Sequence, residues 1–452
     1  MRNGRRPGIF HSRMRRAAQG CIIAIAALVT LSTAQSQPLA GGNYGCSWRG
    51  VSFASPLTSN EQAAAGSLND ARGTSDLRQL ISALDTLSDD QARSALDNLG
   101  GEIYANLARV SLTVASGMLR TIASRIGGLN MGSTIGAAGY ASGLKTAYTN
   151  PWAISETNQT CAPLAVNTTA PSTLGLRGFW MQMLGTSGSA LGDGNAPGYG
   201  YGSQGMMLGY ERTLAGGTVL GATLAYMKTS VTLDSGGSGS FDSPQFATYG
   251  KYASGSWAFK GVVDYATNQY HAARTIAFGD AIDQAQGSYG AQQWSAYAEA
   301  AYDWPLYGFN VQPVAALSWV NLQQDAFTES GAGDADLAVL GGTANTLTSA
   351  LGARVTRSFN TGDGNNARLE LRAYWTPTLT DTETHVTSRF AEAPDSPVFT
   401  VASTQPSRDA ALFGAGFTAQ MWKNLSLHVD YNTTLSDSES SQTVVAGMQY
   451  TW

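Results

Sequence analysis

The last ten residues, Thr443 to Trp452 (TVVAGMQYTW), alternate strictly between two faces of an extended chain. One face carries apolar and aromatic side chains and the other carries smaller or more polar ones: Val444, Ala446, Met448, Tyr450 and Trp452 against Val445, Gly447, Gln449 and Thr451. This period of two indicates a β-strand with one oily side. Its length also matches one tilted crossing of a bilayer by a barrel strand. Taken alone, the stretch is also compatible with the last strand of a soluble sandwich.

The composition favours a membrane barrel over other classes. Only 13% of the 452 residues are charged and 52 are glycine, whereas typical soluble domains have roughly 25% charged residues and about 7% glycine. The net charge of -5 argues against a nucleic-acid-binding protein, because basic residues cluster only near the N-terminus. Beyond that terminus, no apolar run approaches the length of a helical membrane span.

Residues 1–34 have the pattern of an export signal. Six arginines precede the short apolar run Cys21 to Leu31, and Ser32 to Ala34 supply the small residues of a cleavage site. After cleavage behind Ala34 two cysteines remain, Cys46 and Cys161. An oxidising compartment allows a disulfide between them, and sparse cysteine usage is equally compatible with two unpaired thiols.

Residues 35–59 form a short, polar, glycine-rich segment that is too small for an independent domain. From residue 60 to 130 the periodicity becomes helical, and Ser88 with Gln91 predicts a capping box. We expect residues 60–130 to be a helical leader and residues 131–174 to be a linker.

One helix of this leader, Glu102 to Ile126, is long enough to reach across a membrane. Its three arginines, Arg109, Arg120 and Arg125, are costly in lipid. We therefore expect this helix to lie in water or inside a barrel, which it could plug.

Residues 175–452 contain twelve strand-like segments, the even number that an up-and-down barrel requires. They are Leu176 to Ser187, Gly202 to Leu214, Gly217 to Val231, Gln245 to Ser254, Ser256 to Arg274, Tyr289 to Trp304, Gly308 to Asp325, Asn345 to Phe359, Ala367 to Leu379, Arg408 to Met421, Leu425 to Leu435 and Thr443 to Trp452. Long polar loops are expected at Gly188 to Gly200 and at Asp234 to Ser243. The sequence predicts an all-β, twelve-stranded, antiparallel transmembrane barrel.

Where the alternation is clear, charged and polar residues share one face, which should point into the lumen. These residues are Lys260, Asp264, Glu370, Arg372, His428 and Asp430. His428 and Asp430 are two residues apart on one face, as the acid–base residues of a barrel hydrolase could be, but lumenal polar packing is the commoner role. We expect no catalytic residue, cofactor or metal site.

In the order of its motifs, the chain resembles the C-terminal translocator unit of type V autotransporters. The matching stretches are LDNLGGEIYANL (96–107), GDGNAPGYGYGSQGMMLGYERTL (192–214), SAYAEAAYDW (295–304), VQPVAALSWV (311–320), AFTESG (326–331) and LTSALGARV (347–355). The chain departs from the family in two ways. Only about 25 residues stand where a large passenger is usual, and Val445 stands where a polar residue usually precedes the terminal-strand glycine.

The resemblance implies a monomeric outer-membrane barrel that exports or displays its own N-terminal segment, with a very short or vestigial passenger. Outer-membrane lipid, the barrel-assembly machinery and periplasmic chaperones would be its partners, and an assembly signal would comprise Gly447, Tyr450 and Trp452. The alternatives are a stand-alone outer-membrane pore or structural surface protein and, less favoured, a barrel hydrolase.

Overall fold

The computed structural model describes residues 47–48, 51–52, 57–70, 77–128, 177–278, 281–362 and 365–452. The expected signal peptide, most of the segment 35–59, the linker 131–174 and both candidate disulfide cysteines, Cys46 and Cys161, lie outside these residues. Two short paired strands, β1 (Ser47–Trp48) and β2 (Val51–Ser52), precede the helices.

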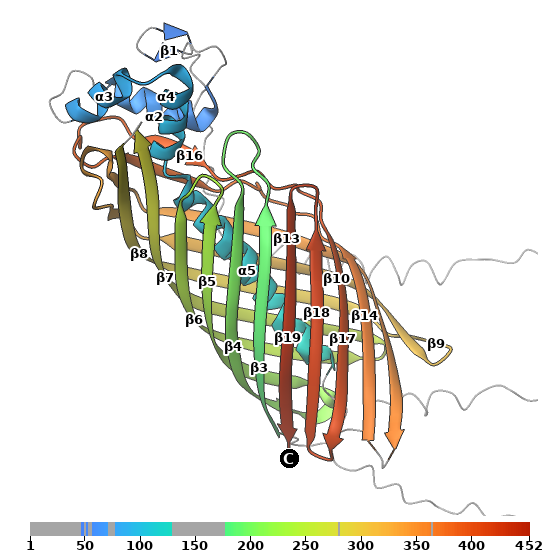
Figure 1. The fold of residues 1–452 in the computed structure, drawn as a ribbon. Coiled ribbons are helices and arrows are strands. Elements are labelled where there is room, and N and C mark those ends of the chain that lie inside the picture. The colour runs from blue at the N-terminus through green and yellow to red at the C-terminus, as the bar shows by residue number, and fades with distance from the viewer. Residues whose placement is uncertain are drawn as a thin grey trace, which may run out of the picture. The chain divides into compact units, whose positions relative to one another are not determined.

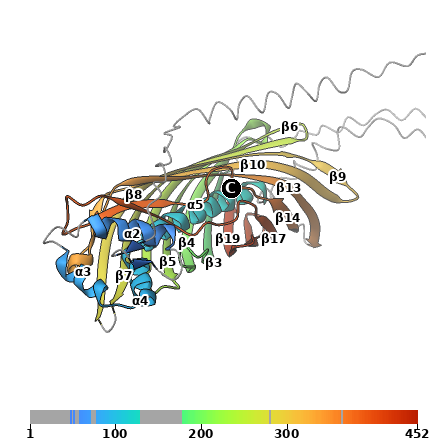
Figure 2. The same cartoon turned by 90° about the horizontal axis from the view of Figure 1, so that it is seen from above.

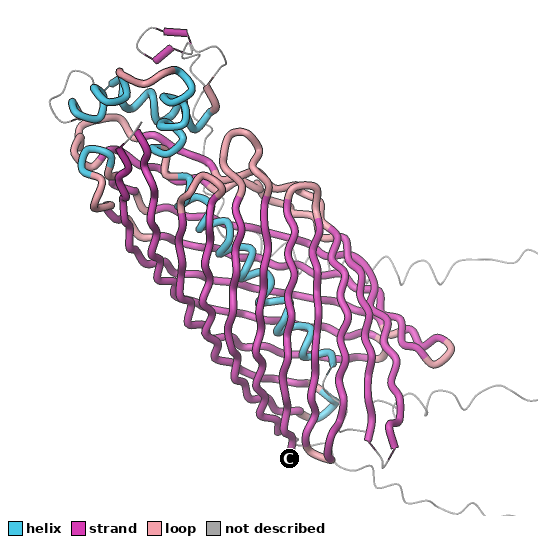
Figure 3. Tube along the Cα trace, viewed as in Figure 1, coloured by secondary structure: helices cyan, strands magenta, loops and turns pink. Residues whose placement is uncertain are grey.

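Twelve antiparallel strands close into a barrel (Figures 1 and 3), as predicted. They are β3 (Arg177–Ala190), β4 (Tyr199–Thr213), β5 (Val219–Leu233), β6 (Ser238–Ser254), β7 (Trp257–Phe278), β8 (Ala281–Tyr302), β10 (Phe309–Gln324), β13 (Gly342–Gly362), β14 (Asn365–Trp375), β17 (Ala411–Trp422), β18 (Leu425–Leu435) and β19 (Glu439–Thr451). Each predicted segment overlaps one of them. Pairing of β19 with β3 and of β10 with β13 leaves none of the twelve with a free edge.

The outward side chains form an apolar band with aromatic residues at its borders. On β7 the band runs from Trp257 to Tyr265, and the next outward positions are Thr267, Gln269 and His271. The ring of Trp257 lies 5.2 Å from that of Tyr302 at one border, and Tyr265 lies 4.8 Å from Trp294 at the other. The alternation predicted for β7, β14, β18 and β19 is confirmed, because their oily faces are exposed and their polar faces are turned inward.

The predicted loop Asp234 to Ser243 is wrong. β5 and β6 continue beyond the apolar band and meet in the turn 234–237, and β8 likewise begins before its predicted start. Outside the band the exposed face of these strands contacts water, so its residues need not be apolar and the alternation in the sequence ends. The hydrogen bonds between the strands nevertheless continue. The predicted loop Gly188 to Gly200 is shorter in the structure. β3 ends at Ala190 and β4 begins at Tyr199, so the loop comprises residues 191–198.

A four-stranded sheet that was not predicted lies in the loops between β10 and β13 and between β14 and β17. We call it the loop sheet; it comprises β11 (Phe327–Thr328), β12 (Leu337–Val339), β15 (His385–Phe390) and β16 (Phe399–Ala402). Leu337, Phe390 and Val401 are buried in it. The remaining short elements are the edge strand β9 (Trp304–Leu306) and two 3-10 turns, η3 (Ala215–Gly217) and η4 (Gly333–Ala335).

Four helices precede the barrel: α2 (Ser59–Asp70), α3 (Arg78–Asp85), α4 (Asp89–Leu99) and α5 (Glu102–Gly128). The predicted capping box between Ser88 and Gln91 is confirmed. Among the residues that the structure describes, no helix has both the length and the apolar character needed to cross a membrane. α5 runs through the barrel interior, whereas the cap helices α2 to α4 lie at one end of it (Figures 1 and 2).

Candidate functional site

The candidate site is the barrel lumen together with α5. The helix packs against the inner faces of β4 to β8, β10 and β13. Apolar side chains such as Leu107, Met118, Leu119 and Ile122 are at most 2% exposed. We call the end of the barrel that carries the cap helices and the loop sheet the mouth, and the opposite end, where β3 begins and β19 ends, the base. Polar contacts fix α5 at the mouth and near the base.

At the mouth, one buried carboxylate joins three parts of the chain. Glu329 accepts hydrogen bonds from the Arg274 guanidinium at 2.5 and 3.1 Å, from the Tyr104 hydroxyl on α5 at 2.6 Å and from the Leu337 backbone N–H at 2.7 Å. Arg274 also donates to the carbonyl oxygen of Asn98, in α4, at 2.7 Å. The ion pair of Arg274 with Glu329 therefore contacts the barrel wall, the loop sheet and the helices at once.

Further contacts bind the loops to the helices. The Asn60 side chain both donates to and accepts from the backbone of Ala402, at 3.0 and 2.9 Å. The Thr384 hydroxyl donates to the carbonyl oxygen of Ala105 at 2.7 Å. Lower on α5, Arg109 pairs with Glu439 at 3.1 Å. The cap helices and the start of α5 are thus attached to the loops by specific, largely buried bonds.

Near the base, Arg125 is held in an aromatic clamp. Its side chain is fully buried, pairs with Glu211 and donates to the Tyr249 hydroxyl at 2.6 Å, and its guanidinium lies 4.0 Å from the centre of the Trp180 ring. Gln449 on the last strand donates to Glu211 at 2.6 Å. Cation–π contact and a buried ion pair together compensate for removing this charge from water.

The clamp depends on glycines in the neighbouring strands. A Cβ on Gly209 would lie 2.2 Å from the Trp180 ring, and one on Gly221 would lie 2.3 Å from the Tyr249 ring. These two positions therefore exclude a side chain, because the two rings lie across them. The glycine content that suggested a barrel has here a specific packing cause.

We expect Arg125→Met to destabilise the folded barrel by about 3–5 kcal/mol, because it leaves Glu211 buried without its partner charge. The temperature at which the purified protein loses its compact electrophoretic form should fall accordingly. The double variant Arg125→Met/Glu211→Gln should recover part of the loss. Equal stability of the single variant and the wild type would show that the clamp does not stabilise the folded barrel.

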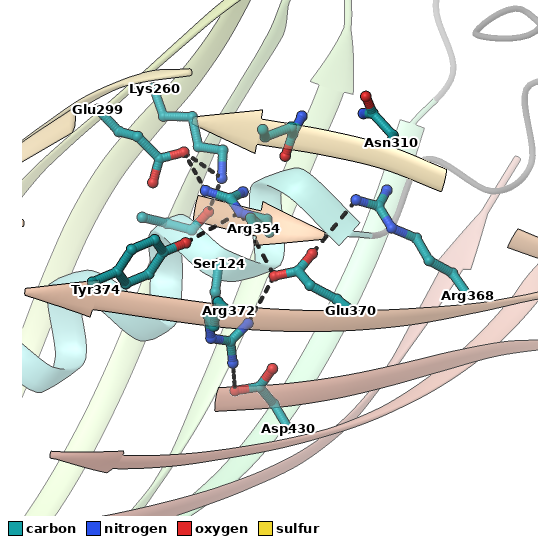
Figure 4. A network of polar contacts seen from close by, with 12 residues as sticks. Ser124, Lys260, Glu299, Asn310, Arg354, Arg368, Glu370, Arg372, Tyr374 and Asp430 are labelled. Carbon is teal, nitrogen blue, oxygen red and sulfur yellow. Dashed lines mark hydrogen bonds and ion pairs between the residues drawn. The ribbon is translucent and has the colours of Figure 1, made fainter. Parts of the chain in front are cut away.

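At the level of Ala123 and Ser124 on α5, charged residues of five strands form one network (Figure 4). Glu299 pairs with Lys260 at 3.1 Å and with Arg354 at 2.7 Å; Glu370 pairs with Arg372 at 2.8 Å and lies 3.8 Å from Arg354. Arg372 also pairs with Asp430. Lys260 donates to the carbonyl oxygen of Ala123 at 2.9 Å, which connects the network to α5.

Four of the six predicted lumenal residues lie in this network: Lys260, Glu370, Arg372 and Asp430. The sequence analysis missed Glu299 and Arg354. Both could have been found from the sequence. Glu299 is the only charged residue in the alternating stretch YAEAAY, and Arg354 is the only charged residue in LGARVT.

Asp264 and His428 also point inward but lie outside the network. Asp264 is 3% exposed and stands opposite Ser295 across the strand pair. His428 contacts the Gln182 amide at 2.5 Å. Asp430 bonds to Arg372 and Asn432, so the structure does not pair His428 with Asp430 as an acid and its base.

The three residues of the expected assembly signal occupy different faces of β19. Tyr450 and Trp452 point outward, 49% and 51% exposed, with their rings 5.9 Å apart. Gly447 points inward, where a Cβ would lie 2.3 Å from the His428 ring and 2.6 Å from the Met181 carbonyl oxygen. Packing alone therefore accounts for glycine at position 447.

Glu102 gives the mouth a titratable group. It lies near Arg274, beyond the border that Tyr265 marks on β7, and it is 6% exposed. Burial raises its pKa from the ordinary 4.5 to about 8; its own backbone N–H opposes the shift, Asp97 and Glu61 add to it, and Arg274 opposes it. Docked Glu102 is therefore protonated at neutral pH.

We expect the docking of the cap helices to weaken as the pH rises from about 4.5 to about 8. Within this window Glu102 keeps its proton in the docked state and loses it in the undocked state. Docking is therefore most stable below pH 4.5, and the contribution of Glu102 to its stability is lost as the pH rises to about 8. Hydrogen exchange of α4 should accelerate over this range. Glu102→Gln should reduce the pH dependence and leave the smaller part that comes from Asp97, whose pKa burial raises to about 6, whereas Glu392→Gln, at an exposed loop position, should not change it. An unchanged slope in Glu102→Gln would assign the effect to another group.

Comparison with known proteins agrees with this architecture. The family model for the autotransporter beta-domain matches residues 179–432. Two extracellular serine proteases of Serratia marcescens are 27% and 28% identical over 275 and 278 residues, and the match covers 61% of this chain but only 26% of theirs. The chain therefore spans about a quarter of the length of these curated relatives.

Solved structures of the same kind are also similar. The translocator domain of autotransporter NalP from Neisseria meningitidis shares 17% identity, with 61% of this chain and 88% of that chain covered and a TM-score of 0.49. The beta domain of the Bordetella autotransporter BrkA shares 18% identity over 61% and 99% of the two chains, with a TM-score of 0.46. On the match of the family model, the chain belongs to the autotransporter β-domain family, whose barrels reside in the outer membrane.

Proposed function

We propose that this chain is a translocator barrel that displays its own N-terminal segment on the cell surface and retains it there. The observation that carries the proposal is the path of α5, which runs the length of the barrel from the mouth to the base (Figure 1). A chain that passes through its own barrel connects a segment on one side of the membrane to a barrel anchored in it.

The loops support the direction of this path. At the base, the first and last strands meet through paired backbone bonds between Arg177 and Trp452, at 3.0 and 3.1 Å. The turns there are short, such as 255–256 and 423–424, whereas the mouth carries the long connections 325–341 and 376–410. Outer-membrane barrels have short periplasmic turns and longer extracellular loops. By this rule the mouth and the cap helices are extracellular.

Retention is supported by the contacts of the cap helices with the loops. The Asn60 bonds to Ala402 and the Arg274 bond to the Asn98 carbonyl oxygen are made only after the helices have reached the mouth. Each such bond contributes on the order of 0.5–1.5 kcal/mol, and more where a charge takes part. A segment destined for release would gain nothing from these bonds.

A stand-alone pore is the second candidate, and the filling of the lumen argues against it. Porin interiors are polar and hold water, whereas α5 buries Leu107, Met118 and Ile122 inside this barrel. Protease activity is named for the Serratia proteins, whose length this chain covers only in part, so we do not extend it to this chain.

Single cysteines can test the proposal in a chain whose Cys46 and Cys161 are replaced by serine. Ser94→Cys lies on the exposed face of α4 and Asn424→Cys lies in a base turn, also exposed. On intact cells, a membrane-impermeant maleimide should label position 94, and it should label position 424 only after the outer membrane is permeabilised. The reverse pattern would refute surface display.

A further inference from the structure

α5 fills the lumen unevenly. The helix packs against β4 to β8, β10 and β13, and a space with both polar and apolar lining lies between it and the wall that includes β14 and β17 to β19. This space has two parts, a central part and a part nearest the mouth, that share the lining residues Thr113, Arg120, Tyr201, Thr434 and Ser441. Because five residues line both parts, they are neighbouring portions of one side space.

A third part continues the side space towards the base. It shares Ser124, Glu370 and Arg372 with the central part and reaches Arg125 and His428. The part nearest the mouth reaches Arg109 and Ser407. The side space therefore follows α5 from the level of Arg109 to that of Arg125.

Hydroxyl groups line the part of the side space nearest the mouth. Six of these residues are Thr346, Thr348, Thr376, Thr378, Ser440 and Ser441. Serine and threonine hydroxyls can each donate or accept a hydrogen bond, so they can solvate a small ion of either sign. The preference for one sign must come from the charged residues.

The charged lining is positive. With His428 counted as neutral, six arginines and four carboxylates line the three parts, which leaves two excess positive charges. Among the described residues, Arg109 and Arg125 each have a glutamate partner, whereas Arg120 has neither an ion pair nor a hydrogen bond. The phenols of Tyr201 and Tyr297, which carry no charge at neutral pH, line the same part of the side space as Arg120.

We propose that Arg120 makes the side space a binding and permeation path for small inorganic anions while α5 remains in the barrel. A cation that is withdrawn from bulk water and lacks a carboxylate is stabilised by a counter-ion. Low-dielectric walls with charge of one sign concentrate ions of the opposite sign, and arginines in a pore favour anions. The inference concerns the resident state of the barrel and holds whichever segment is displayed.

The test is the reversal potential of the full-length folded protein in a planar bilayer under a KCl gradient. The wild type should show a small, anion-selective conductance, and Arg120→Lys should retain the selectivity. Arg120→Gln should lower the chloride-to-potassium permeability ratio several-fold, and Arg120→Glu should make the path cation-selective. The matched control is Arg408→Gln at an exposed loop position, which should behave as the wild type.

Sulfate provides a second measurement. Added sulfate should reduce the chloride current of the wild type and of Arg120→Lys, because it competes at the same cation, and should have no effect on Arg120→Gln. Heat-modifiable migration identifies the variants that are folded. An intact wild type with no current or no anion preference would overturn the proposal, as would an unchanged reversal potential in Arg120→Glu. A barrel that lacks residues 59–126 shows the conductance of the empty lumen. If anion selectivity appeared only at that conductance, the proposal would also be overturned, because the ions would then pass through the empty lumen.

Discussion

Deleting Tyr450 to Trp452 should abolish the folded barrel in the outer membrane and leave the chain aggregated or degraded in the periplasm. β19 is paired on both sides, and Tyr450 stands between Leu425 of β18 and Phe179 of β3. Without these residues the closing ladder opens at the base, and each backbone group left unpaired in lipid costs several kcal/mol. The deletion also removes two outward aromatic side chains from the border of the apolar band.

Heat-modifiable migration of the outer-membrane fraction measures this effect. Trp452→Phe is the control, since it keeps the backbone and an aromatic ring and should leave assembly close to normal. Gly447→Ala separates recognition of the terminal strand from packing, because its Cβ would collide with the His428 ring and the Met181 carbonyl oxygen. It should lower stability without removing the outward aromatic residues. A normal barrel after deletion of residues 450–452 would refute a role of the terminal strand in assembly.

The barrel could be predicted because lipid imposes a strict pattern on its strands. Every lipid-facing position of β14 or β19 must be apolar, so the alternation in Leu369 to Trp375 and in Val444 to Trp452 is complete. The loop sheet escaped prediction because its strands have two to six residues and meet other loops, not lipid. In strands this short, whose two faces contact different surroundings, the sequence shows no regular alternation of apolar and polar residues.

The faces of the lumenal residues could also be predicted, but their partners could not. Lys260 pairs with Glu299 because the two stand opposite each other in the register of β7 and β8. Arg354 stands opposite Arg372, and the glutamates beside them separate the two like charges. Such pairs require the register between strands, which a single sequence does not reveal.

The off-centre position of α5 could not be inferred from the helix itself. All three arginines of the helix are equally unsuited to lipid, yet within the described part of the chain Arg109 and Arg125 pair with glutamates and Arg120 does not. The difference depends on which strand faces each turn of the helix.

Removing residues 59–126 should convert a weakly conducting barrel into an open pore. An α-helix with its side chains occupies a cylinder about 10–12 Å across, and α5 lies inside the barrel along the length of the lumen. Its removal should give a large rise in single-channel conductance in planar bilayers. The remaining wall retains its charged network, so the enlarged lumen should stay wet.

Deletion of residues 59–99 alone is the matched control, because it removes the cap helices and keeps α5. If α5 closes the lumen, this shorter deletion should leave the conductance low, and the Arg125 clamp should hold the helix near the base. High conductance after the shorter deletion would mean that the cap helices and their bonds to the loop sheet keep α5 in place. Equal and low conductance of both deletions would mean that another part of the chain fills the barrel, and α5 would then not be the plug.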